Sequence, residues 1–178
     1  MLMSDPLLIT TFTTWKSTQQ SNSSDDLIAA LLHHKRLPMT AHLLRQLPVH
    51  FRLAPQQVIT TVETIRPAAV ICCGMAEKRS HLTVEIQGHF QGETFCTSVD
   101  LQALVRRLPH TTISDNAGRF VCNYLYYRLL KYLRSRDSSV PCIFVHVPIL
   151  TEENRSHIMH DFDHLLQQIS HMHTTVYH

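Results

Sequence analysis

The sequence predicts an α/β protein, a three-layer α/β/α sandwich with a mixed, mostly parallel central sheet. Short apolar runs alternate along the chain with stretches in which apolar residues recur at helical spacing, the pattern of strands alternating with helices. Two of the runs, 68–73 and 142–147, are apolar almost throughout, as in strands covered by helices on both faces. No internal repeat appears, and a chain of 178 residues fits a single domain, which we expect to span 1–178.

The first half of the chain predicts three strands and two helices. Leu7–Phe12 is an apolar, β-branched run that predicts a strand, and the polar stretch 13–24 predicts a loop. A helix is expected to begin near Ser24 and to end before Leu37-Pro38. The segments that follow predict a strand over 41–49, for which a helix is the alternative, a helix over 55–65, and a buried strand over 68–73 that stops at Gly74.

The second half continues the alternation. A strand over 82–86 is expected at an edge of the sheet, followed by a turn region over 88–97. A short helix over 100–108 and a brief strand over 111–114 come next. The last elements expected are a long helix after Gly118, a central strand over 142–147, and a final helix from about 152 that leads into a His-rich tail.

The composition excludes several classes of protein. No apolar run approaches the ~20 residues of a membrane helix, and a dispersed net charge of +2 does not predict a nucleic-acid surface. Five cysteines without a CxxC pair indicate reduced thiols rather than a disulfide framework. The first residues lack the pattern of a signal peptide. We therefore expect a cytoplasmic protein with neither a membrane nor a nucleic acid as partner.

Fourteen histidines raise the question of a metal site. His157, His160 and His164 share one helical face, and His171, His173 and His178 follow. A zinc site needs three or four ligands at suitable spacing, and the chain contains neither HExxH nor a Cys-His finger. We expect an exposed, His-rich helix, no metal and no cofactor. A phosphate-handling enzyme is disfavoured because no glycine-rich phosphate loop is present.

One stretch combines features of a cysteine nucleophile. Ser114–Asn123 leaves a short apolar run, turns, and enters the longest helical pattern, which places Cys122 near the start of a helix. Unpaired backbone N–H groups and the helix dipole favour a thiolate there, so its pKa is expected to fall from ~8.5 toward 7. His146, at the end of the strand 142–147, would be the base. The alternative is that Cys122 is a small core residue.

The residues Ser-Asp-Asn-Ala-Gly-Arg-Phe-Val-Cys-Asn (114–123) and Phe-Val-His-Val-Pro (144–148) resemble the pyroglutamyl peptidase I, or pyrrolidone-carboxylate peptidase, family of cysteine peptidases. Leu82-Thr83-Val84-Glu85 resembles the segment that carries the family's catalytic glutamate. The resemblance runs from about Leu7 to about Glu153. It implies an exopeptidase that removes an N-terminal pyroglutamyl group from peptides through a thioester on Cys122, with His146 and Glu85 completing the catalytic set.

The resemblance also implies substrate-binding residues. Phe12 and Trp15 match the two aromatic positions that flank a pyroglutamyl ring in the family, and a flat lactam needs apolar walls. The alternative is that both side chains only cover the core. The partner implied is a peptide with an N-terminal pyroglutamate. The oligomeric state stays open, with a homo-oligomer as one alternative.

The chain departs from the family at several places. After the central strand the family has Gly-Gln-Ala-Gly-Gly-Arg, whereas this chain has Gly-Met-Ala-Glu-Lys-Arg over 74–79. Family glycines around the first strand are replaced by Thr11, Lys16 and Ser17. The segment between Glu85 and Cys122 is shorter and lacks a loop with an arginine implicated in oxyanion support. The alternative function is therefore a diverged, peptidase-like protein with altered acyl specificity or little activity, acting as a binding module.

Overall fold

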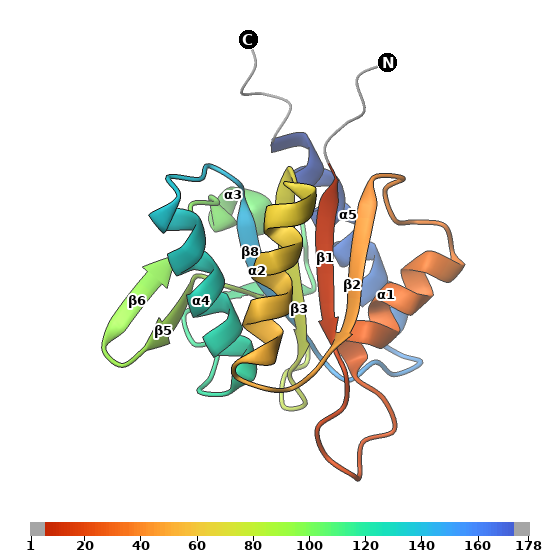
Figure 1. The fold of residues 1–178 in the computed structure, drawn as a ribbon. Coiled ribbons are helices and arrows are strands. Elements are labelled where there is room, and N and C mark those ends of the chain that lie inside the picture. The colour runs from red at the N-terminus through yellow and green to blue at the C-terminus, as the bar shows by residue number, and fades with distance from the viewer. Residues whose placement is uncertain (1–5, 173–178) are drawn as a thin grey trace.

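The structure is a computed structural model that describes residues 6–172 (Figure 1). It confirms the α/β fold with a mixed, mostly parallel sheet between two layers of helices. The sheet has six strands, in the spatial order β2 (Ala41–Leu47), β1 (Leu7–Phe12), β3 (Ala69–Met75), β8 (Cys142–Val147), β4 (Leu82–Glu85) and β7 (Thr111–Ser114). The first four run parallel to one another, β4 is antiparallel to β8, and β7 is parallel to β4.

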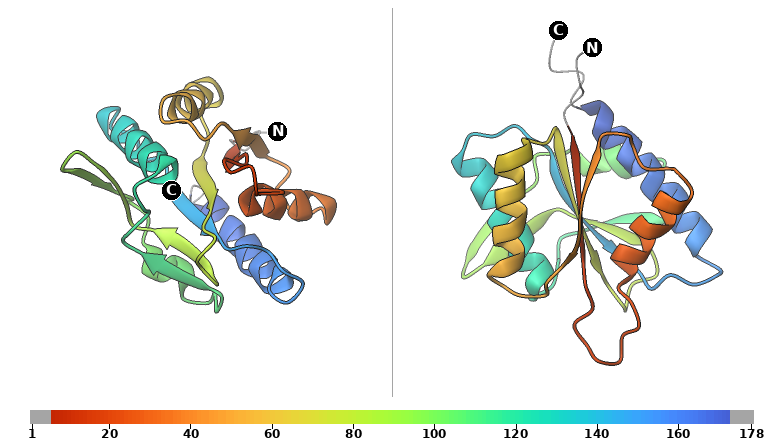
Figure 2. Two further views of the ribbon diagram at one scale, coloured as in Figure 1. Left: turned by 90° about the horizontal axis from the view of Figure 1, so that it is seen from below. Right: turned by 45° about the vertical axis from the view of Figure 1, so that its right-hand side comes forward.

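Helices cover both faces of the sheet (Figure 2). On one face lie α2 (Leu53–Ile65) and α4 (Val121–Ser135), and on the other lie α1 (Ser23–His33), α3 (Leu101–Val105) and α5 (Arg155–Met172). Successive side chains of a strand point to opposite faces. Leu8 and Phe144 accordingly pack with α2 and α4, whereas Ile9 and Val145 pack with α1 and α5. Strands buried on both faces explain why β1, β3 and β8 read as nearly continuous apolar runs.

The strand over 82–86 does not lie at an edge, so that expectation was wrong. All four residues of β4 are buried, and β4 lies between β8 and β7. The edge is formed by β7, whose last two residues are only half-buried. The sequence of β4 does not indicate which strands will flank it in the sheet. Its partner β8 lies some sixty positions further along the chain, so the pairing depends on a long-range contact.

The expected turn region 88–97 instead contains a β-hairpin, β5 (Gln87–Phe90) and β6 (Glu93–Cys96), which stands apart from the main sheet against α4 (Figure 1). Gln91 and Gly92 both have positive φ, as in the tight primed turns that join hairpin strands. Gly88 lies directly on the helix, since a Cβ there would come within 2.3 Å of the backbone nitrogen of Tyr127. Glycine is therefore what allows the hairpin to approach α4.

Smaller differences concern where elements begin and end. The first helix begins at Ser23 rather than Ser24, because the side chain of Asn22 caps it by accepting the backbone N–H of Ser24. The third strand continues beyond Gly74 to Met75, α3 ends at Val105 instead of 108, and α5 begins at Arg155 instead of 152. Between residues 6 and 172, none of the helices combines the length and apolar character that a membrane span requires.

Candidate active site

The residues singled out in the sequence converge on the α2/α4 face of the sheet. Cys122 lies in the first turn of α4, and His146 lies one residue before the end of β8. Both line one cavity of about 140 Å³, together with Phe12 and Trp15. Glu85, the last residue of β4, lies behind His146 and is fully buried. The fold therefore brings all five predicted site residues together.

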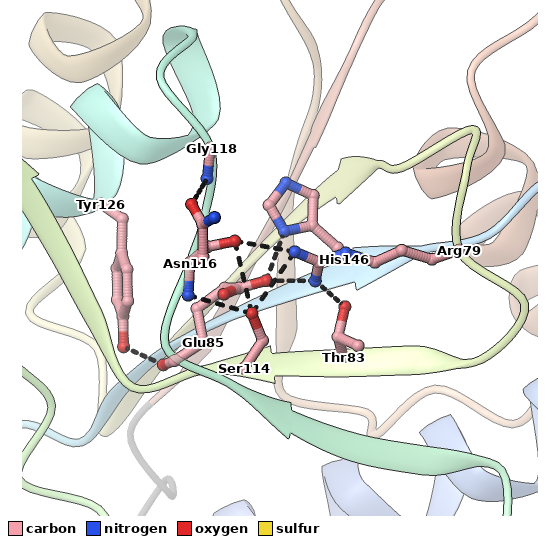
Figure 3. A network of polar contacts seen from close by, with 8 residues as sticks. All are labelled: Arg79, Thr83, Glu85, Ser114, Asn116, Gly118, Tyr126 and His146. Atoms are coloured by element: carbon pink, nitrogen blue, oxygen red, sulfur yellow. Dashed lines mark hydrogen bonds and ion pairs between the residues drawn. The ribbon is translucent and has the colours of Figure 1, made fainter.

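Glu85 holds the imidazole of His146 from behind. His146 Nδ1 lies 2.7 Å from Glu85 Oε1, and both side chains are buried (Figure 3). Because the carboxylate accepts the proton on Nδ1, Nε2 is left as the nitrogen that can take a proton from a thiol. This tautomer is the one that a general base opposite a cysteine requires.

Glu85 reaches His146 through the pairing of β4 with β8. The two strands run antiparallel, so their carboxyl ends point in opposite directions and do not bring the two side chains together. Glu85 instead pairs with Phe144, and His146 pairs with Thr83, so Glu85 and His146 are diagonal neighbours on one face. The pairing register, rather than the strand end, positions the carboxylate.

Arg79 ties Glu85 to the loop before α4. Its guanidinium donates to Glu85 Oε1 at 2.5 Å and also to Thr83 Oγ1. These two bonds come from Nη1, and Nη2 donates to the carbonyl oxygen of Asn116 at 2.8 Å (Figure 3). Nothing in the sequence pattern gave Arg79 a role, although it is the arginine that ends the segment 74–79, which resembles the family's glycine-rich segment.

These contacts keep Glu85 ionised. Burial opposes its ionisation, but the bonds with His146, Ser114 and Arg79 outweigh burial and lower its pKa. Among the described residues, Glu85 Oε2 has no hydrogen-bond partner. The contacts with His146 and Arg79 both fall on Oε1, and Ser114 adds a hydrogen bond that favours the ionised carboxylate. A negative charge therefore stands next to His146 at neutral pH.

The expectation of a lowered pKa for Cys122 was wrong. Burial raises the pKa of its thiol to about 12, and the neighbouring Cys72 thiol and Glu85 carboxylate add to that effect. The backbone N–H at the helix start and the cation of Arg79 favour the thiolate but do not outweigh burial. At neutral pH Cys122 is therefore a neutral thiol in this site.

Gly74 makes room for the sulfur of Cys122. A Cβ at this position would lie 2.7 Å from Cys122 Sγ and 3.0 Å from Phe144 Cζ. The side chain of Phe144 is fully buried, so the thiol is the group that has to move. The first turn of α4 has no side-chain cap, which leaves its backbone N–H groups for an oxyanion beside this sulfur.

We expect Gly74→Ala to lower kcat/KM about 10–10²-fold in a folded protein, because a reacting atom displaced by about 1 Å costs that much. The measurement is hydrolysis of a pyroglutamyl fluorogenic amide, with thermal unfolding to show that the variant is folded. Unchanged kcat/KM in a folded variant would mean that the sulfur does not need its present position.

The walls of the cavity are mostly apolar. Phe12 is 2% exposed and belongs to the core beneath the cavity, whereas Trp15 is 37% exposed and stands at its mouth. Met75, where the family has glutamine, also lines the cavity, and its sulfur accepts the backbone N–H of Ser23 at 3.3 Å. The side chain of Asn22 lines the cavity too, but it is used by Thr13 and Ser24. The cavity thus suits a small ring with few polar atoms.

The histidines do not assemble into a metal centre within the described residues. Between residues 6 and 172, no group of three or more His, Cys, Asp or Glu side chains is arranged to hold a metal ion. His160 and His164 face each other with their Nε2 atoms 3.2 Å apart, and His157 packs on His110 instead. His173 and His178 lie outside the described residues.

Comparisons with known proteins find relatives that all belong to one peptidase family. The model of the pyroglutamyl peptidase family matches residues 94–165, which include Cys122 and His146. The pyrrolidone-carboxylate peptidase of Bacillus cereus is 27% identical over 152 residues, covering 71% of each chain. The one from Brevibacillus brevis is 28% identical over 136 residues, covering 62% of this chain and 63% of the relative.

Solved structures show the same fold. Pyroglutamyl peptidase I from Bacillus amyloliquefaciens superposes with a TM-score of 0.80 at 19% identity, covering 94% of this chain and 96% of that one. Pyrrolidone carboxyl peptidase from Thermococcus litoralis superposes with a TM-score of 0.78 at 19% identity, covering 96% and 94%. At this identity the likeness shows the shared fold.

Proposed function

We propose that this chain is a member of the pyroglutamyl peptidase family, whose model matches residues 94–165. It is then a cysteine exopeptidase that hydrolyses an N-terminal pyroglutamyl group from peptides through a thioester on Cys122. One observation carries the proposal: an imidazole held by a buried carboxylate shares a cavity with a cysteine at a helix start. We propose Cys122 as nucleophile, His146 as general base and acid, and Glu85 as the residue that orients His146.

The geometry supports the following sequence of steps. The pyroglutamyl ring enters between Phe12 and Trp15, which brings its acyl carbon to Cys122. His146 Nε2 takes the thiol proton, the sulfur attacks the acyl carbon, and the oxyanion is bound by N–H groups of the first turn of α4. The imidazolium then protonates the departing amine, which leaves a thioester. A water molecule activated by His146 hydrolyses the thioester, releasing pyroglutamate and restoring the thiol.

Glu85 acts on the proton transfer. Its ionised carboxylate stabilises the imidazolium that forms when the thiol gives up its proton. This matters here because burial makes the neutral thiol the resting form. Arg79 holds the carboxylate in place and brings a positive charge close enough to favour the thiolate.

A second function is favoured by the wall of the cavity. Met75 presents a thioether where the family has an amide, which removes a hydrogen-bonding group from the acyl pocket. The alternative is therefore a diverged member whose pocket prefers a less polar acyl group or turns over slowly. All five cysteines are free, which fits the reducing, cytoplasmic location that we propose for either function.

We expect the protein to hydrolyse a pyroglutamyl fluorogenic amide and to lose this activity on treatment with iodoacetamide. The exposed Cys96 also reacts with alkylators, so the Cys96→Ser variant is used and the modified residue is mapped. A matched amide of cyclopentanecarboxylic acid, which has a ring of equal size without the lactam, tests the alternative. Turnover of this analogue alone would favour altered specificity, and turnover of neither would contradict the proposed peptidase activity.

A further inference from the structure

A continuous run of aromatic side chains leads from the mouth of the cavity across the surface. The aromatic stripe consists of Trp15, Phe120, Phe51, Tyr124 and Phe90, in that spatial order. Consecutive ring centroids are 6.4, 5.7, 5.5 and 4.8 Å apart. The tryptophan and the three phenylalanines are each between 36% and 47% exposed. Large apolar side chains seldom gather on a surface in contact with water.

Four separate segments build the aromatic stripe, the first of them the loop after β1, which carries Trp15. Phe120 and Tyr124 lie four positions apart at the start of α4, Phe51 precedes α2, and Phe90 comes from the hairpin that Gly88 allows to lie on α4. Residues four apart share one side of a helix, so α4 aligns its two rings. The hairpin that the sequence analysis missed thus supplies the far end of the aromatic stripe.

We propose that the aromatic stripe binds the leaving part of the peptide substrate, the residues that follow the scissile bond. This inference rests on the proposed function. Trp15 and Phe120 both line the cavity and reach the surface, so the aromatic stripe begins where the peptide has to leave the acyl pocket. An extended peptide advances about 3.3 Å per residue, so side chains on one of its faces repeat at about twice that spacing. The ring spacings at the Trp15 end, 6.4 and 5.7 Å, come nearest to this repeat, and those toward Phe90, 5.5 and 4.8 Å, are shorter.

Charge along the aromatic stripe indicates the chemistry of that peptide. Arg52 and Arg119, the sequence neighbours of Phe51 and Phe120, are exposed, and the guanidinium of Arg128 lies 5.8 Å from the ring centre of Tyr124. In the described part of the chain, no acidic side chain forms an ion pair with any of these three. The substrates favoured are therefore peptides with aromatic or other large apolar residues after pyroglutamate, and with a free C-terminal carboxylate.

The test compares short and long substrates on the same site. Wild type is given a pyroglutamyl fluorogenic amide and pyroglutamyl pentapeptides with phenylalanine or alanine at alternate leaving positions. We expect Phe51→Ala and Phe90→Ala to lower kcat/KM for the phenylalanine pentapeptide about 2–10-fold each. Both variants should keep the turnover of the short amide. Met39→Ala, which removes a fully exposed apolar side chain elsewhere, is the matched control.

A binding measurement keeps the inference separate from the proposed function. Trp15 is the single tryptophan of the chain, so its fluorescence reports binding of both pentapeptides to the inactive Cys122→Ala protein, and the difference between their affinities reports the aromatic stripe. Tighter binding of the phenylalanine pentapeptide than of the alanine one, weakened by Phe90→Ala, supports the inference even if turnover is absent. Equal binding of both peptides overturns it. Sedimentation of wild type and Phe51→Ala tests whether a second copy of the chain covers the aromatic stripe instead. Self-association of wild type that is lost in Phe51→Ala would make the aromatic stripe an interface between copies and would contradict the proposal.

Discussion

Replacing Cys122 by alanine is expected to abolish hydrolysis of pyroglutamyl amides, with a loss in kcat of about 10⁵–10⁶-fold. Removing the nucleophile of a peptidase of this kind leaves only binding and oxyanion support, which is why the loss is so large. The substitution removes one sulfur atom from a half-buried position, so the fold should persist. The measurement is turnover of the fluorogenic amide, with circular dichroism and thermal unfolding as checks on folding.

The matched control is Cys96→Ala, which removes a thiol from the exposed hairpin away from the cavity. We expect this variant to keep wild-type activity. A thioester trapped by rapid acid quench should carry the acyl group on Cys122 in wild type and should be absent from Cys122→Ala. Residual activity of Cys122→Ala above about a hundredth of wild type would assign the chemistry to another group.

Replacing Glu85 by glutamine is expected to lower kcat about 10–10³-fold while keeping the fold. An amide preserves the shape of the side chain and a hydrogen bond to His146, but it removes the charge that stabilises the imidazolium. The corresponding change in a serine triad costs about 10⁴-fold, and a thiol needs less help from its base. The variant also leaves the guanidinium of Arg79 without its carboxylate, which adds a positive charge next to His146.

The pH dependence has a sign that follows from the direction of the pKa shift. The pKa of Glu85 is lowered in the folded protein, below its ordinary value of 4.5. Its charge, and the stability that the charge contributes, are therefore present at neutral pH and are lost as the pH falls through the folded pKa. Wild type should therefore lose stability toward acid more steeply than Glu85→Gln. Glu93→Gln, which affects an exposed pair with Lys131, is the control.

Equal turnover of Glu85→Gln and wild type would remove Glu85 from the site.

Local patterns in the sequence were sufficient for most elements and for placing Cys122 at a helix start and His146 near a strand end. The strand ending near His146 and the helix that begins before Cys122 each follow from hydrophobic periodicity and a breaker, which are properties of neighbouring residues. The alternation of strands and helices likewise predicted the layered fold. The hairpin 87–96 was missed because its turn uses Gln91-Gly92, a weaker signal than Asn-Gly, and its strands alternate poorly.

The sequence by itself determined which residues we propose for the chemistry, their order along the chain and the kind of element on which Cys122, His146 and Glu85 lie. Only the tertiary structure decided that β4 runs antiparallel to β8, that Arg79 holds Glu85, and that burial raises the pKa of Cys122 to about 12. Strand order, ion pairing and burial depend on segments far apart in the chain. Periodicity reports only on positions a few residues apart, so these three properties arise when the sheet and its helices pack together.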